Sequence, residues 1–67
     1  MAFHVLTPRE RDIAMLVAAR LSNREIAEKL YLSEGSVKQY VNHIYAKLFI
    51  EGDTRTKRKR LVEMTQH

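Results

Sequence analysis

The sequence predicts an all-α domain of four helices built around a central helix-turn-helix. Ala27, Ser33 and Val37 fall six and then four residues apart. In a helix-turn-helix this spacing places a small residue where two helices cross, a cap at the start of the second helix, and an apolar side chain in the angle between them. Only two glycines and one proline interrupt the 67 residues, and no strand-like alternation persists. The periodicities are therefore helical.

The first two helices each open with a capping box. Thr7–Glu10 combines a hydroxyl N-cap, a proline at the first helical position and a glutamate at the third. Ser22–Glu25 repeats the box and opens a short helix that should end near Tyr31, whose ring is expected to pack in the following turn. The positions expected to be buried in these two helices are Ile13, Leu16, Val17, Ile26, Ala27 and Leu30.

The third helix, capped by Ser33, carries the clearest amphipathic pattern. Its apolar stripe recurs at steps of four, three and four residues: Val37, Val41, Ile44 and Leu48. Its opposite side holds small, basic and amide side chains: Gly35, Lys38, Gln39, Asn42 and Ala46. Glu51–Asp53 indicates a turn, with Asp53 or Thr54 as the cap of a final helix that extends towards Met64.

Length and charge restrict the classes of function. Residues 1–67 make one small domain, and a chain of this size buries only about 60% of its unfolded surface, which disfavours a deep catalytic cleft. The net charge of +4 favours a polyanion, which could be DNA, RNA or an anionic membrane. The chain has no cysteine, no leader-like start and no apolar run near the length of about 20 residues that spans a bilayer. We expect a cytoplasmic protein with no cofactor and no membrane partner.

Five motifs then occur in order: Leu6–Glu10, Leu21–Ala27, Leu32–Ser33, Ser36–Lys38 and Lys47–Leu48. In these motifs the chain resembles the C-terminal DNA-binding domain of bacterial transcription regulators of the LuxR, FixJ and NarL type. The resemblance covers most of the chain. It implies a four-helix domain whose third helix enters the major groove of double-stranded DNA and whose fourth helix often forms a homodimer. RNA polymerase is a further candidate partner, and the full protein is often a response regulator of a two-component system.

Five positions depart from the family pattern. Arg20 stands where the family commonly has glycine, so its backbone must be right-handed, extended or strained. Phe49 replaces a second usual glycine, and Tyr40 replaces a common histidine. Thr56–Lys57 replaces the Ala-Val pair that usually packs the fourth helix. The changes at Arg20, Phe49 and Tyr40 affect local geometry but not the fold, and the change at Thr56–Lys57 leaves dimerisation through the fourth helix open.

The exposed face of the third helix is the candidate reading surface. Polar residues opposite a core stripe are usually just solvated, but the resemblance places Lys38, Gln39 and Asn42 at base-reading positions. Glutamine and asparagine can pair with adenine N6 and N7, and lysine can reach guanine O6 and N7.

Phosphate contacts are expected mainly at helix starts, where free amides and the helix dipole favour anions. The candidates are Ser22, Asn23, Arg24, Ser33, Ser36, Tyr40 and Lys47. Simpler roles remain open for several of them. Ser22 and Ser33 can serve only as caps, the ring of Tyr40 can pack over the core, and Lys47 can complement the C-terminus of its helix.

Two features of the last helix have alternative interpretations. The run Lys57–Arg60 spreads around all sides of a helix and is most often a solvated end, although a phosphate contact is an alternative. Leu61, Val62 and Met64 form a small apolar patch. This patch either closes the core against the first helix or meets its copy in a homodimer.

Other classes of function have weaker support. His4, His43 and His67 lie far apart and suggest no metal site, and no nucleophile has an evident base, so we expect no catalytic residue. An RNA-binding module would need exposed aromatic rings, and a protein-interaction bundle would need an exposed apolar groove. The chain is thus expected to be the effector domain of a larger regulator or, alternatively, a small free-standing regulator of the GerE kind.

Overall fold

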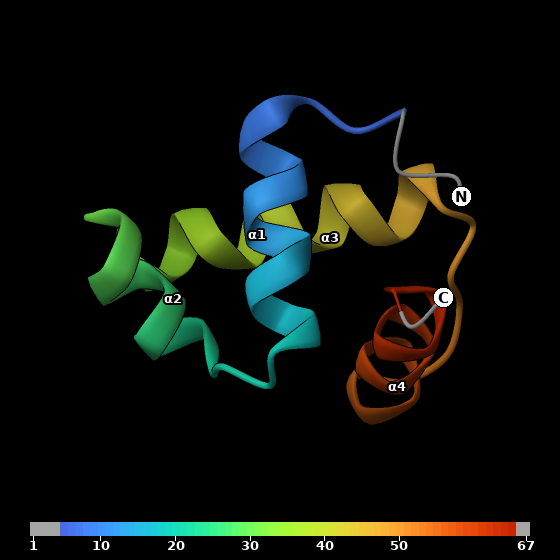
Figure 1. The fold of residues 1–67 in the computed structure, drawn as a ribbon. Helices are drawn as coiled ribbons and strands as arrows, with labels where there is room; N and C mark the ends of the chain where they lie inside the picture. The colour runs from blue at the N-terminus through green and yellow to red at the C-terminus, as the bar shows by residue number, and fades with distance from the viewer. Residues whose placement is uncertain (1–4, 66–67) are drawn as a thin grey trace.

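The computed structural model describes residues 5–65, and this part of the chain contains four helices and no strand. They are α1 (Pro8–Ala18), α2 (Asn23–Leu30), α3 (Glu34–Lys47) and α4 (Thr54–Thr65). Helix α1 crosses α3 and contacts α2 and α4 as well, whereas α2 packs along the first half of α3 (Figure 1). The all-α prediction is confirmed, with α2 and α3 as the two helices of the helix-turn-helix.

The predicted caps form at each helix start. Thr7 Oγ1 accepts from the Glu10 amide at 3.2 Å, and Glu10 Oε1 accepts from the Thr7 amide at 2.8 Å. Ser22 and Glu25 repeat this pair of bonds at 3.1 and 2.8 Å. Ser33 and Asp53 accept from the third amide of α3 and α4, respectively. Each cap satisfies amides that have no partner within the helix.

Helices α1, α2 and α3 all end in a left-handed residue that is not glycine. Arg20, Tyr31 and Phe49 have φ values of 70°, 58° and 56°. In each case the amide of the next residue donates to a carbonyl five positions earlier, the 6→1 bond of a Schellman motif. Arg20 therefore takes the strained conformation, which costs about 1–2 kcal/mol for a residue with a Cβ. Tyr31 is 95% exposed, so the prediction that it packs in the turn is wrong.

Replacing Phe49 with glycine is expected to stabilise the domain by about 1 kcal/mol, because glycine adopts positive φ without strain. The ring is 91% exposed, so its removal forfeits little packing. Urea denaturation followed by circular dichroism measures the change. Arg11→Gly, at an exposed position inside α1, should instead destabilise by up to about 1 kcal/mol. A Phe49→Gly variant with a lower free energy of unfolding than the wild type would contradict the claim that the backbone at Phe49 is strained.

The core is assembled from the predicted stripes. Ile13, Val17, Ile26, Val37, Ile44 and Leu61 are the largest fully buried side chains. The α3 stripe is buried as expected, and Leu61 and Val62 close the core against α1. Their burial confirms the first of the two roles considered for this patch. The structure adds Tyr45, which is buried beside the stripe and carries Lys57 Nζ 5.4 Å from its ring centroid.

Candidate nucleic-acid interface

The polar face of α3 is exposed along its length. Gly35, Lys38, Gln39, Asn42 and Ala46 are all exposed. Val37, Val41 and Ile44, which alternate with them along the helix, are buried. The core stripe therefore fixes the rotation of α3 about its axis, and the lysine and amide side chains extend into solvent. A helix with this exposed face fits the width of the DNA major groove, about 12 Å.

The start of α2 holds three of the candidate phosphate ligands. Ser22 is exposed but its hydroxyl oxygen accepts the Glu25 amide, so it acts as a cap. Arg24 is exposed and lies 3.4 Å from Glu28, a surface ion pair that contributes little and can exchange for a phosphate. Asn23 is half-buried, and its side-chain oxygen accepts from Arg58 Nη1 at 3.2 Å. The partner of Asn23 comes from α4 and could not be read from local spacing.

The start of α3 holds a second group of candidate phosphate ligands. Ser33 caps the helix and donates its hydroxyl to Ser36 Oγ at 3.0 Å. Tyr40, one turn further along, is half-buried and its ring packs against the core. The packing role considered for Tyr40 is thus present, while a phosphate contact by its hydroxyl stays a prediction.

Lys47 has a partner that sequence reasoning missed. Its ammonium lies 2.7 Å from Glu10 Oε1, and the Glu10 side chain is only 7% exposed. The hydrogen bond from Lys47, followed by the bond from the Thr7 amide, lowers the pKa of Glu10 below its ordinary value. Lys47 therefore joins the end of α3 to the start of α1, which is a different role from the helix-end complement considered above. Lys47 is also exposed, so a phosphate contact by this residue stays a prediction.

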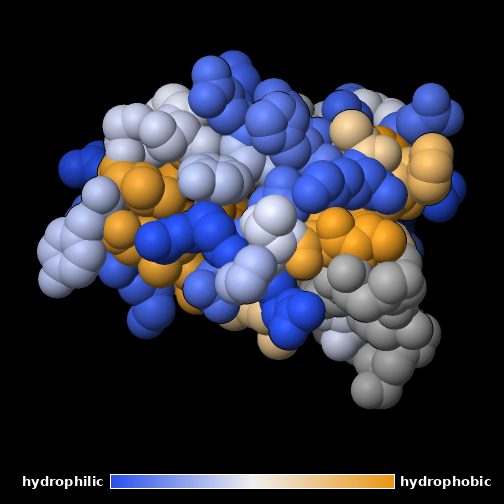
Figure 2. All heavy atoms as spheres, turned by 90° about the horizontal axis from the view of Figure 1, so that it is seen from above, coloured by the Kyte–Doolittle hydropathy of each residue, from blue (hydrophilic) through white to orange (hydrophobic). Residues whose placement is uncertain are grey.

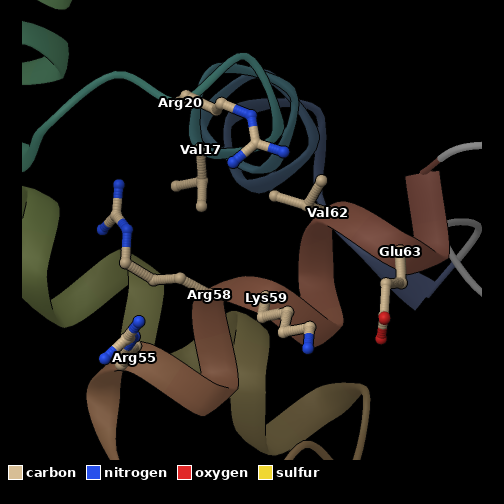
Figure 3. Close-up of a pocket in the computed structure, with 7 residues that line it drawn as sticks. All are labelled: Val17, Arg20, Arg55, Arg58, Lys59, Val62 and Glu63. Carbon is tan, nitrogen blue, oxygen red and sulfur yellow. The ribbon is translucent and has the colours of Figure 1, made fainter.

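The basic run Lys57–Arg60 is not simply a solvated end, because two of its members are half-buried. Lys57 covers Tyr45, and Arg58 donates to the Leu21 carbonyl and to Asn23. The prediction of a solvated run is wrong for these two residues. A hollow of about 520 Å³ lies beside them, between the end of α1 and α4 (Figure 3). Its lining is mostly cationic: Val17, Arg20, Arg55, Arg58, Lys59, Val62 and Glu63.

Three other observations bear on the alternatives. Residues 5–65 contain no cluster of three metal-ligating side chains and no helix long and apolar enough to cross a membrane. His43 is exposed, while His4 and His67 lie outside the described residues. Among residues 5–65 the exposed large aromatic rings are Tyr31 and Phe49, and they stand at opposite ends of α3. On the face shown in Figure 2, hydrophilic side chains predominate and hydrophobic ones appear in separate areas.

Comparison with known proteins identifies the family. The model of the luxR family of bacterial regulatory proteins matches residues 4–59. The chain is 45% identical over 49 residues to the transcriptional regulatory protein LnrK of Bacillus subtilis, covering 73% of this chain and 22% of LnrK. It is 49% identical over 43 residues to the nitrate/nitrite response regulator protein NarL of Escherichia coli, covering 64% and 20%. It is 41% identical over 49 residues to the activator DevR/DosR of Mycobacterium tuberculosis, covering 73% and 23%.

The fold and the matched motifs define a DNA-binding helix-turn-helix domain. The chain belongs to the luxR family of bacterial regulatory proteins, and its function is DNA binding in transcription regulation. This family is a class of regulatory domains and not a class of enzymes. The chain spans between 5% and 23% of the length of the curated relatives it matches.

Proposed function

We propose that this domain binds double-stranded DNA sequence-specifically by inserting α3 into the major groove. Lys38, Gln39 and Asn42 would read base edges. The observation that carries the proposal is the exposure of these three side chains on a helix whose other side is anchored by fully buried Val37 and Ile44. Each residue offers the hydrogen-bonding groups that major-groove readout uses.

The phosphate ligands would come from the starts of two helices. The candidates there are Ser22, Asn23, Arg24, Ser33 and Ser36, with Tyr40 and Lys47 further along α3. The positive ends of the helix dipoles at α2 and α3 support an anion there. These contacts would set the register of α3 without reading the sequence.

The residues that α4 buries and exposes support a proposal for the oligomeric state. Leu61 and Val62 are buried within the chain, while Arg55, Lys59 and Arg60 are exposed on the same helix. A two-fold contact through α4 would bring these like charges together, so we propose that the free domain reads DNA as a monomer. A homodimer through α4, with the two reading helices about one DNA turn apart, is the alternative.

In a complete protein this domain would be an effector. NarL is named a response regulator, and the chain matches only 20% of its length, which supports an effector domain of a larger regulator in the bacterial cytoplasm. A small free-standing regulator is the alternative. RNA polymerase is a further candidate partner in either case, and it would contact surfaces of the domain that DNA leaves free.

Selection of bound duplexes from a random pool tests the proposal. The chain should enrich one short motif, bind it at least about 10³-fold more tightly than unrelated duplex at physiological salt, and lose affinity steeply as salt rises. An enriched single half-site supports a monomer, and an inverted repeat supports the dimer. Equal affinity for all duplexes, or stronger binding to single-stranded RNA than to any duplex, would overturn sequence-specific DNA reading.

A further inference from the structure

Arg58 is the only member of the run Lys57–Arg60 with hydrogen bonds that cross to another helix start within residues 5–65. Its guanidinium donates to Asn23 Oδ1 at 3.2 Å and to the Leu21 carbonyl, residues 35 and 37 positions away in the chain. In Figure 3 its side chain leaves α4 and extends away from Lys59 and Glu63. Arg58 thus connects α4 to the segment that leads into α2.

These two bonds fix both the backbone and the side chain at the start of α2. The Leu21 carbonyl lies just before the Ser22 cap, so the bond restrains the position of the cap. A guanidinium has donors and no acceptor, so the oxygen of the Asn23 amide must face Arg58. The NH2 group of that amide then points away from Arg58. Within residues 5–65 it donates to no acceptor, and it lies beside the positive end of α2.

The backbone of α4 at Arg58 is held in place by the packing of neighbouring residues of the same helix. Leu61, one turn after Arg58, is fully buried, and Lys57 covers the ring of Tyr45. Lys59 and Arg60 carry the same charge on the same helix but are exposed. They serve as matched controls, because each has the same charge as Arg58 without its bonds to Leu21 and Asn23.

We propose that Arg58 is a positioning residue for DNA binding: it holds the start of α2 so that the Asn23 amide donates to a backbone phosphate. The inference rests on the proposed function. It assigns α4 a part in the interface without placing Arg58 itself on the DNA. A phosphate oxygen accepts hydrogen bonds only, so the orientation that Arg58 imposes is the one that a phosphate requires.

A double-substitution cycle on DNA affinity tests the proposal. Asn23→Ala and Arg58→Ala should each weaken binding to selected and unrelated duplex by about tenfold, the scale of one lost charge-assisted hydrogen bond. The double variant should bind no more weakly than either single variant, because both substitutions remove the same contact. Arg60→Ala, the matched control, should not couple to Asn23→Ala.

The salt dependence separates positioning from direct contact. If Arg58 itself neutralised a phosphate, its removal in the Asn23→Ala background would reduce the slope of log K against log salt by about 0.9. Positioning predicts an unchanged slope in that background. Additive effects in the cycle, or the reduced slope, would overturn the proposal.

Two further variants keep the test valid if Arg58→Ala folds poorly. Asn23→Asp retains an acceptor for Arg58 and should melt no lower than the wild type, yet it loses the donor and should bind DNA at least tenfold more weakly, on the order of one charged hydrogen bond. Arg58→Lys keeps the charge but cannot hold both acceptors with one planar fork, so it should bind as weakly as Arg58→Ala. Wild-type affinity in either variant would overturn the proposal. Failure of the wild-type chain to select any duplex would instead overturn the proposed function.

Discussion

Glu10→Ala is expected to be the most destabilising single substitution at a polar position, costing about 2–3 kcal/mol. The change removes a capping box and leaves Lys47 without the carboxylate that lies 2.7 Å away. Lys47 is partly exposed and its ammonium can return to water, so the loss is that of the capping bonds and one charged hydrogen bond, not of a fully buried ion pair. Small domains have only about 5 kcal/mol or somewhat more to lose, so the variant should melt at a clearly lower temperature than the wild type. Thermal and urea denaturation followed by circular dichroism measure the loss.

Glu25→Ala provides the matched control. Glu25 makes the same two capping bonds at the start of α2, but its site is exposed and it has no lysine partner. Its loss should cost clearly less than the loss of Glu10, because the Ser22 cap remains and the site is exposed to solvent. Equal destabilisation by the two alanine substitutions would show that the Lys47 pair contributes nothing.

The ion pair between Glu10 and Lys47 also makes the stability of the fold depend on pH in the acidic range. The bond from Lys47 lowers the pKa of Glu10 in the folded state, so the carboxylate binds a proton more readily when the chain unfolds. Its contribution is present above the unfolded-state pKa of about 4.3 and is lost as the pH falls through the lower folded-state pKa. Stability should therefore decline on acidification, and Glu10→Gln should show a shallower decline. Caps at Glu25 and Asp53, which also lower the pKa of their carboxyls, account for the slope that remains.

The elements that sequence predicted are those set by local chemistry. A capping box is complete within four residues, and the α3 stripe repeats within one helix, so Thr7–Glu10, Ser22–Glu25 and Val37–Leu48 indicate starts and buried faces without tertiary information. The same periodicity separates the exposed face of α3 from its core face. This is why the candidate base-reading residues could be named, although their contact with DNA stays a prediction.

The elements that sequence missed depend on pairs distant in the chain. Lys47 meets Glu10, and Arg58 meets Asn23, across separations of 37 and 35 residues. Neither pair has a local signature, and a run of four basic residues gives no sign of which member turns inward. Tyr31 was placed wrongly because its flanking leucines pack while its own left-handed backbone directs the ring into solvent. Burial at such a turn follows from the three-dimensional path of the chain.

The reading face of α3 carries the second large effect. Gln39→Ala/Asn42→Ala is expected to weaken binding to the selected duplex by about 2–6 kcal/mol, at least about thirtyfold, because each amide can make a bidentate contact worth about 1–3 kcal/mol. Affinity for unrelated duplex should stay nearly constant, since phosphate contacts supply it. Fluorescence anisotropy on both duplexes at one salt concentration measures the two affinities.

His43→Ala is the control for that experiment, because His43 is exposed on α3 directly beside Asn42 but lies outside the predicted reading set. It should leave the preference between the two duplexes within about twofold, as expected for a surface substitution that makes no special contact. Repeating the selection with each single alanine variant then assigns the readers, since losing one reader relaxes the preference at its own base pair and leaves the rest of the motif intact. A double variant that retains the wild-type preference would mean that the two amides do not read the bases, and that Lys38 or another surface of the domain does.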